Sequence, residues 1–387
     1  MYPTLYDLVL DIFGLSIPAF KLVQSFGMMV AIAFVAGSIV VKSELKRKED
    51  IGLLTSIKKK VWIGKSSTLA DKAFSAIVGF LIGYKLLGLV LEFDTISSNP
   101  QDFILSLEGS MLGGLLGAAI SVALRIWEDR KEALPEPKEV ELTVHPYEQT
   151  GNIIILAAVF GILGSKLFHN LENVDEMLAD PMGALLSFSG LSFLGGFVCA
   201  TIAILWFARK NNIKMLPLAD ALLPALMLSY GIGRIGCQIA GDGDWGIPND
   251  NPKPEWLSFL PDWAWAYNYP NNVLGINLKA DFAQQGYLSL TGYAYPTPIY
   301  ETTMALLIFG FLWYMRKRWS IPGMMVVWYL LLSGIERLAI EQVRINNEYD
   351  ILGYGITQAE IISTILIILG LIGIFYMPKV GEKWAKY

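Results

Sequence analysis

Residues 229–248 read SYGIGRIGCQIAGDGDWGIP and join a hydrophobic run to a polar segment. Arg234 stands among glycines inside the apolar part, and Asp242 and Asp244 follow where that part ends. An arginine is costly in an apolar membrane segment, so it should face a cavity, a partner or an anionic ligand. The glycines let backbone or a lipid headgroup approach closely, and they permit positive φ at a helix end. The stretch therefore predicts a membrane helix that ends beside a lipid-phosphate site.

The composition extends this membrane assignment to the whole chain. Of the 387 residues, 54% are hydrophobic and 17% are charged, and the mean hydropathy is +0.47. A soluble domain carries about 25% charged residues. Apolar runs of about 20 residues, the length that crosses a bilayer, recur along the sequence. We expect an all-α integral membrane protein that forms a single polytopic domain over residues 1–387.

The apolar runs predict about nine transmembrane helices, preceded by a short amphipathic lead-in at residues 1–17. The expected spans are 18–41, 73–93, 106–126, 152–170, 185–208, 218–239, 298–315, 322–341 and 356–377. One set of alternate loops holds 22 lysines and arginines, and the other set holds three. Because cytoplasmic loops carry the basic excess, the N-terminus is predicted to lie outside and the C-terminus inside.

Several classes of function find no support in the residue types. No extended basic stripe indicates nucleic-acid binding. Cys199 and Cys237 lie in or beside apolar spans, so no disulfide framework is predicted. His145 and His169 are too few for a histidine-based metal site, and no Cys/His cluster occurs. We expect neither a metal nor a cofactor.

One hairpin of the chain reads as a duplicate of another. The segments GFLIGYKLLGLVLE (79–92) and FGILGSKLFHNLEN (160–173) are similar, as are SMLGGLLGAAISVAL (110–124) and SFLGGFVCATIAIL (192–205). Residues 73–126 are therefore predicted to repeat the hairpin 152–208. Lys85 and Lys166 correspond between the copies, and each could pair with a neighbouring carboxylate or helix end, or could contact a ligand.

Three connections have a character of their own. Residues 42–72 and 129–142 are charged inner loops, expected as solvated segments, the first a positively charged flank that could also touch anionic headgroups. Residues 241–296 form the longest outer loop and are rich in tryptophan, tyrosine and proline. Aromatic rings settle at the headgroup level, so this extracytoplasmic loop is predicted to be ordered and to act as a cap or lid.

A second group of polar residues is predicted on the same membrane side as Arg234. Glu301, beside Tyr300, falls about one turn into the seventh span. Arg337, Glu341 and Arg344 are spaced i, i+4, i+7, which places them on one helical stripe. This ladder could be an internally satisfied structural network. Because a guanidinium matches phosphate oxygens bidentately, the ladder together with Arg234 favours a headgroup clamp.

These motifs carry a resemblance to the prolipoprotein diacylglyceryl transferase family, which covers most of the chain apart from the extra hairpin at 73–126. GRIGCQIAGDGDWG resembles the family signature through Arg234, Gly236, Gly241 and Gly246, with Asp242 or Asp244 as the acid. LVQSFGMM (22–29) and YPTPIYE (295–301) resemble two further motifs, and the family's Arg-x-x-x-Glu-x-x-Arg stands intact at Arg337, Glu341 and Arg344. The resemblance implies transfer of diacylglyceryl from phosphatidylglycerol to the lipobox cysteine of a preprolipoprotein signal peptide, in a lipid-gated cavity at the outer face of the bacterial inner membrane.

The chain departs from the family where protons are handled. The family's expected histidine base is Leu194, and its tyrosine before the first glycine is Phe26. The signature asparagine is Cys237, and the tyrosine one turn before Arg337 is Ser333. The phosphate-binding half of the family's site is therefore retained, and the proton-handling half is largely replaced.

The reaction requires a thiolate nucleophile and fixed positive charge for the departing phosphate. The predicted catalytic residues are Arg234, Arg337, Glu341, Asp242 and His169, and the predicted substrate-binding residues are Arg344, Glu301, Tyr300, Gly246, Gly236 and Asp244. His169 could equally be an interface histidine without a chemical role, and Cys237 a thiol used for packing. Three functions stay open: a lipid-headgroup transferase, a non-catalytic or altered-specificity member that binds phospholipid or lipoprotein precursor, and a transporter built on the duplicated hairpins.

Overall fold

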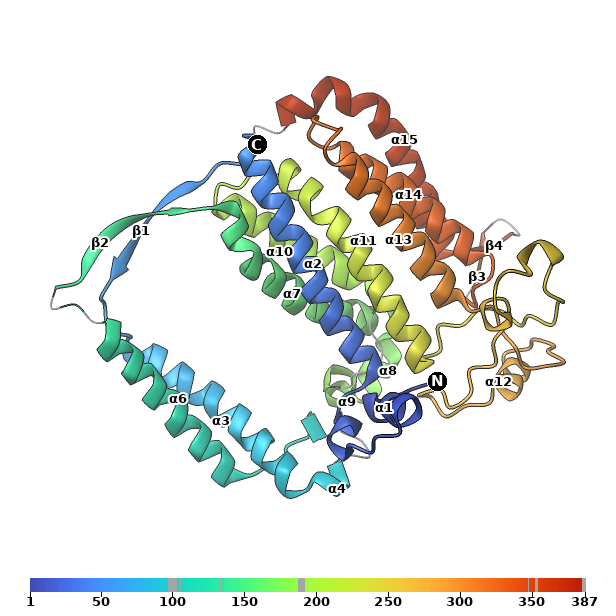
Figure 1. Cartoon of the computed structure of the whole chain (residues 1–387), viewed down its shortest axis with the longest axis horizontal. Coiled ribbons are helices and arrows are strands. Elements are labelled where there is room, and N and C mark those ends of the chain that lie inside the picture. Colours follow the sequence, from blue (N-terminus) through green and yellow to red (C-terminus); the bar gives the residue numbers. More distant parts are fainter. Residues whose placement is uncertain are drawn as a thin grey trace. The chain divides into compact units, whose positions relative to one another are not determined.

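The computed structural model describes residues 1–96, 103–104, 106–132, 134, 136–186, 192–346, 348–351 and 354–384 (Figure 1). It divides into two compact units. The first comprises residues 1–55, 146–154 and 205–387, and the second comprises residues 56–145 and 155–204. Each unit is described by itself.

The described residues are mostly helical, and seven helical segments are long and apolar enough to cross a membrane. These are Ser25–Asp50, Leu69–Leu91, Met111–Glu132, Pro146–Glu172, Phe193–Lys210, Met215–Ala240 and Gln358–Gly381. The other two predicted spans, 298–315 and 322–341, form helices α13 (Thr297–Met315) and α14 (Met324–Glu341). Both carry charged residues near one end, and as membrane spans they remain predictions, as does the orientation of the chain.

Five helices of the first unit lie side by side in a row (Figure 1). α2 (Ser25–Asp50) packs on α11 (Met215–Ala240), α11 packs on α13, α13 on α14, and α14 on α15 (Gln358–Trp384). α11, α13 and α14 share a core that includes Met227, Ala305, Ile308, Leu312 and Met325. Small residues allow the helices to approach closely. The row brings α11, α13 and α14 together, and these are the helices that carry the predicted site.

At the end of this row away from the predicted site, buried charges tie the helices to one another. Glu44 accepts a hydrogen bond from Arg316 at 2.7 Å and pairs with Arg47 at 2.8 Å. Lys48 lies 3.6 Å from Asp220, whose carboxylate also accepts the backbone N–H groups that start α14. Removing one partner of such a pair would leave an uncompensated buried charge.

The N-terminal segment and the long loop belong to the same unit. Thr4 caps the N-terminus of α1 (Leu5–Phe13). Before it, the Tyr2 N–H donates to Ile239 O at the end of α11. The segment 241–296 contains η3 (Glu255–Leu257), η4 (Asp262–Ala264) and α12 (Leu278–Gln284). It has a hydrophobic core of its own, made by Trp245, Tyr269, Leu278, Phe282 and Ala294. The loop is therefore ordered by packing, and its place on the outer membrane surface remains a prediction.

Small antiparallel ribbons are the part of the architecture that an all-α prediction misses. The predicted solvated loops 42–72 and 129–142 contribute β1 (Ile57–Ile63) and β2 (Lys138–Val144), which pair in full register from Ile57↔Val144 to Ile63↔Lys138. In β2, apolar residues at 140, 142 and 144 alternate with polar ones, as the two-residue period of a strand allows. Both strands are mostly exposed. A second ribbon, β3 (Glu348–Ile351) with β4 (Tyr354–Thr357), precedes α15.

In the second unit, α3 (Leu69–Leu91) packs tightly on α6 (Met111–Glu132), and α4 (Phe93–Ile96) follows α3. A Cβ added at Gly83 would lie 2.2 Å from Gly113 O, so only glycine permits this approach. Lys85 donates to three backbone carbonyls, those of Phe103, Ser106 and Glu108. Lys85 thus binds backbone carbonyls between α3 and α6. These contacts favour a structural role for Lys85 over a ligand contact.

The predicted second copy forms α7 (Thr150–Glu172), preceded by η2 (Pro146–Gln149), and α10 (Phe193–Lys210). Between them lie α8 (Val174–Ala179) and α9 (Pro181–Leu186), so the fifth long helix begins at Phe193 rather than at 185. Residues 187–191 of that predicted span lie outside the described residues. A Cβ added at Gly164 would lie 2.6 Å from Gly195 O. Ser192 N–H donates to Ser165 O as Ser110 N–H does to Tyr84 O.

Candidate functional site

A buried glutamate on α13 is the centre of the site. Glu301 lies one turn after the start of α13, and its side chain is fully buried. The helix starts at Thr297, and Pro298 stands in its first turn. Proline has no backbone N–H, which costs no hydrogen bond there because first-turn N–H groups have no partner within the helix. Tyr230 of α11 donates its hydroxyl to Glu301 Oε1 at 3.1 Å. A carboxylate without solvent needs positive partners.

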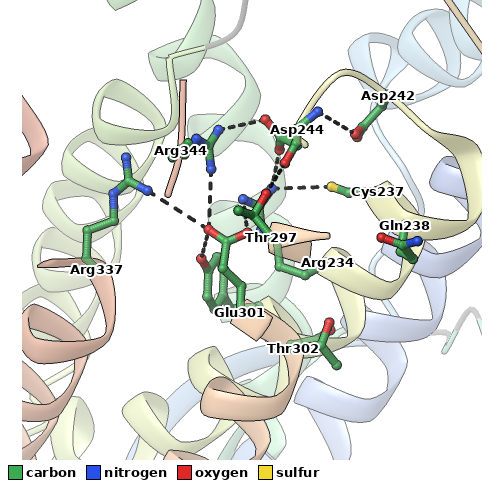
Figure 2. Close-up of polar contacts among 12 residues, drawn as sticks. Arg234, Cys237, Gln238, Asp242, Asp244, Thr297, Glu301, Thr302, Arg337 and Arg344 are labelled. Atoms are coloured by element: carbon green, nitrogen blue, oxygen red, sulfur yellow. Dashed lines mark hydrogen bonds and ion pairs between the residues drawn. The ribbon is translucent and has the colours of Figure 1, made fainter. Parts of the chain in front are cut away.

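Three arginines from different segments supply them, as Figure 2 shows. Arg234 of α11 forms an ion pair with Glu301 Oε2. Arg344, just beyond α14, reaches Glu301 Oε1 with Nη1 at 3.3 Å. Arg337 of α14 places Nη1 4.0 Å from the same oxygen, and its Nη2 pairs with Glu341 at 2.8 Å. The i, i+4 spacing read from the sequence therefore produces the Arg337–Glu341 pair.

Asp244 is the second anion of the cluster. Its carboxylate pairs with Arg234 and accepts from Arg344 Nη2 at 2.6 Å, so Arg234 and Arg344 each bridge Asp244 and Glu301. Burial acts to raise the pKa of Asp244, but the charges of Arg234 and Arg344 outweigh it and hold that pKa below its usual value. Asp244 therefore stays ionised in the site.

Asp242 has the opposite electrostatic setting. It lies between Cys237 and Asp244, and its Oδ1 accepts the Asp244 N–H at 3.4 Å. Burial, together with the neighbouring Asp244 charge, raises the pKa of Asp242. Two adjacent carboxylates whose pKa values move apart are suited to different tasks, one to hold charge and the other to exchange protons.

Backbone contacts hold the loop after α11 against the start of α13 and the end of α14. Gly241 ends α11 in the left-handed region at φ +66°, with its N–H on Cys237 O. Gly246 pairs with Arg344 through an isolated antiparallel bridge, and a Cβ on it would lie 2.2 Å from Val343 O. Thr297 donates its hydroxyl to Asp244 O at 2.5 Å. The glycines of the signature thus bring three segments into one site.

The ion pairs of the cluster join three arginines to three carboxylates, and the arginines differ in exposure. The cations Arg234, Arg337 and Arg344 face the anions Asp244, Glu301 and Glu341. The side chain of Arg234 is 11% exposed, whereas those of Arg337 and Asp244 are 28% and 31% exposed. Arg337 is also farthest from Glu301. An anion arriving from outside therefore meets the Arg337 flank first.

Most of the predicted site residues come together, and a few have other surroundings. Arg234, Arg337, Arg344, Glu301, Glu341, Asp242 and Asp244 form the cluster. Tyr300 directs its hydroxyl to Trp265 O at 3.4 Å, which links α13 to the 241–296 segment. Gly236 faces Met29 and Phe26 of α2, so it allows α11 and α2 to pack closely. His169 belongs to the second unit, where Asn173 contacts its Nδ1 at 3.3 Å, and its role in the site remains a prediction.

The positions that the sequence reading identified as departures from the family remain predictions, and their surroundings are as follows. Phe26 packs beside Gly236, and the Ser333 hydroxyl bonds back to Tyr329 O within α14 at 2.7 Å. Leu194 lies on α10 in the second unit. Cys237 is buried and accepts from Arg234 Nη1 at 3.4 Å. Cys237, Asp242 and Asp244 offer sulfur and oxygen ligands within 4.8 Å of one another, but Arg234 already places positive charge among them.

Sequence reasoning missed two contributors. Tyr230 precedes Arg234 by one helical turn, so the i, i+4 spacing could have placed it on the same face. Thr297 lies within the motif YPTPIYE, but its contact could not be predicted, because it is to a backbone carbonyl 53 positions earlier in the chain.

Comparison with known proteins identifies the chain's relatives. A family model described as prolipoprotein diacylglyceryl transferase matches residues 131–376. A protein of Dehalococcoides mccartyi named phosphatidylglycerol–prolipoprotein diacylglyceryl transferase is 26% identical over 242 residues, covering 62% of this chain and 81% of the relative. Proteins of the same name from Corynebacterium glutamicum and Leptospira interrogans are 26% and 23% identical, covering 68% and 80% of this chain and 77% and 88% of the relatives. These are distant homologues, but the match spans more than half of this multi-pass membrane protein, which belongs to the prolipoprotein diacylglyceryl transferase family.

Proposed function

We propose that this protein transfers the diacylglyceryl group of phosphatidylglycerol to the thiol of a lipobox cysteine in a preprolipoprotein signal peptide. The reaction is placed at the outer face of the bacterial inner membrane. The observation that carries the proposal is the convergence of Arg234, Arg337 and Arg344 on Glu301 from α11, α14 and the segment beyond α14. Family membership and the names of the relatives support the same assignment.

The arginines would act on the leaving group. A thiolate attacks the glycerol carbon that carries the phosphate, a carbon–sulfur bond forms, and the carbon–oxygen bond to the phosphate breaks. Negative charge then grows on the departing glycerol phosphate. Guanidinium groups already fixed by Asp244, Glu301 and Glu341 can stabilise that charge without reorganising. The more open Arg337 flank is the expected seat of the phosphate.

The test uses purified protein in vesicles with phosphatidylglycerol and a lipobox peptide. Wild-type protein should release glycerol phosphate and attach the lipid to the peptide thiol. Arg234→Ala should stop the release, because it removes the cation that bridges Asp244 and Glu301. Arg316→Ala is the matched control, since Arg316 also pairs with a buried glutamate but lies at the other end of the helix row. Absence of release from the wild type would refute the proposed transfer.

A second candidate function follows from the residues that replace the family's proton-handling groups. Phe26 and Leu194 carry no proton acceptor, and the Ser333 hydroxyl is engaged within its own helix. These substitutions favour a member that binds phospholipid or lipoprotein precursor without catalysis. Co-purification of phosphatidylglycerol with wild-type protein that releases no glycerol phosphate would select this alternative.

A further inference from the structure

Glu336 is a buried carboxylate of α14 that the cluster described above does not use. The residue is 5% exposed and directly precedes Arg337. Its Oε1 has no hydrogen-bond partner, and among the described residues Glu336 takes part in no ion pair within 4.0 Å. Glu301 and Glu341, by contrast, both face arginines. A buried polar atom without a partner is costly and calls for an explanation.

The surroundings of Glu336 connect it to the site. It lies within electrostatic range of Glu301 and of all three arginines of the cluster. Two phenols also lie within that range, Tyr329 on its own helix and Tyr230 on α11. Tyr230 is the residue whose hydroxyl donates to Glu301. Glu336 is thus a second buried carboxylate that interacts electrostatically with Glu301, and Tyr230 interacts with both.

The balance of charges indicates the protonation state of the Glu336 carboxyl. The three arginines are matched by Asp244, Glu301 and Glu341, so no cation of the cluster is left for Glu336. An isolated carboxylate is far too costly to bury, and such a group takes up a proton instead. An incoming lipid phosphate brings one more negative charge, which strengthens this tendency.

We propose that Glu336 is a proton-transfer residue that compensates for the missing family histidine, an inference that rests on the proposed transfer reaction. The sulfur of the acceptor thiol bonds to the glycerol carbon as the carbon–oxygen bond to phosphate breaks. In the same step the proton held by Glu336 passes to the departing glycerol phosphate, and the thiol proton passes to the Glu336 carboxylate. One proton passes from thiol to phosphate, and Glu336 ends the turnover neutral, as it began. Because Glu336 is buried, Tyr230 is the group placed to relay the proton.

The experiment compares Glu336→Gln, Glu336→Asp and the control Glu44→Gln, which removes a buried carboxylate at the other end of the helix row. Glu336→Gln should still bind phosphatidylglycerol and should lose about 10²–10⁴-fold in glycerol phosphate release, the usual contribution of proton transfer. Glu336→Asp should recover part of the rate, and Glu44→Gln should keep it. Infrared spectroscopy should find a protonated carboxyl band in the wild type that Glu336→Gln removes.

Each outcome bears on the proposal separately from the proposed function. Wild-type release rates in Glu336→Gln would overturn the inference and leave the transfer reaction standing. Parallel loss of lipid binding and release, without recovery in Glu336→Asp, would mean a structural role and would also overturn it. If the wild type releases no glycerol phosphate, the infrared band alone decides whether Glu336 holds a proton. If Glu336→Gln does not fold, infrared spectra of wild-type protein with isotopically labelled glutamate report the protonated carboxyl band. Absence of that band overturns the inference.

Discussion

Two substitutions of Arg337 distinguish its contribution to phosphate binding from its contribution to the stability of the fold. In Arg337→Lys, the ammonium can still pair with Glu341, but the planar fork that matches two phosphate oxygens is lost. In Arg337→Ala both are lost. Glu341, whose side chain is 1% exposed, then keeps, among the described residues, only the hydrogen bond from Asn346 at 2.7 Å. The two variants therefore remove different parts of what Arg337 does.

The expected magnitudes follow from these contacts. A hydrogen bond to a charged group contributes about 1.5–3 kcal/mol, so Arg337→Ala should weaken phosphatidylglycerol binding by roughly 10- to 150-fold. Removing one partner of a buried ion pair costs about 3–5 kcal/mol, and partial exposure of Arg337 places this site at the lower end of that range. Arg337→Lys should lose about tenfold in lipid affinity while its unfolding midpoint stays near that of the wild type.

Lipid binding in nanodiscs and thermal unfolding of the same samples measure the two effects. Arg316→Ala is the control, because it breaks a buried arginine–glutamate pair far from the cluster and should lower stability without changing lipid affinity. His169→Ala should weaken binding less than Arg337→Ala does. The clamp assignment is refuted if Arg337→Ala binds phosphatidylglycerol like the wild type, or if Arg316→Ala or His169→Ala loses as much affinity.

Two further predictions address the loop after α11. Gly246→Ala should destabilise the protein by about 1–3 kcal/mol and reduce transfer. The added Cβ would lie 2.2 Å from Val343 O and must push the loop away from Arg344. An unchanged unfolding midpoint and unchanged activity would contradict the close approach. Asp242→Asn should be more stable than the wild type at neutral pH. A raised pKa in the folded state means that stability is complete below the ordinary value of 3.8 and is lost as pH rises through the folded-state pKa. The difference between the two unfolding midpoints should therefore vanish in acid, and parallel midpoints over the whole pH range would contradict it.

The parts of the fold that depend on local pattern were predictable from sequence. Apolar runs of sufficient length predicted the long helices, and the i, i+4 spacing predicted the Arg337–Glu341 pair. The ribbon β1–β2 was not predictable in this way, because its strands are about 80 positions apart and their pairing is not a local property. The orientation of the chain and the duplication of the hairpin stay predictions, although Gly83 and Gly164 make corresponding close contacts.

The site itself was predictable as a list of residues but not as an arrangement. Sequence reasoning placed Arg234, Arg337, Arg344 and Glu301 near one membrane face, yet nothing in their spacing shows that one glutamate is the common partner of all three arginines. Nor could it distinguish Gly236 and Gly246 as packing residues from residues that contact lipid, because both roles require the absence of a side chain. Only the neighbouring backbone decides between them.

The same limit applies to the search for a proton-transfer group. Matching the chain to a family motif asks what stands at each family position, and for the histidine position the sequence predicts Leu194. Charge balance asks a different question, namely which buried carboxyl lacks a cation once every arginine of the cluster has been paired. That question selects Glu336, a residue with no distinguishing feature in the sequence except that it precedes Arg337. A group that moves protons needs only a suitable charge environment within reach of the reacting atoms, so its function can be supplied from a different helix than the one that carried it before.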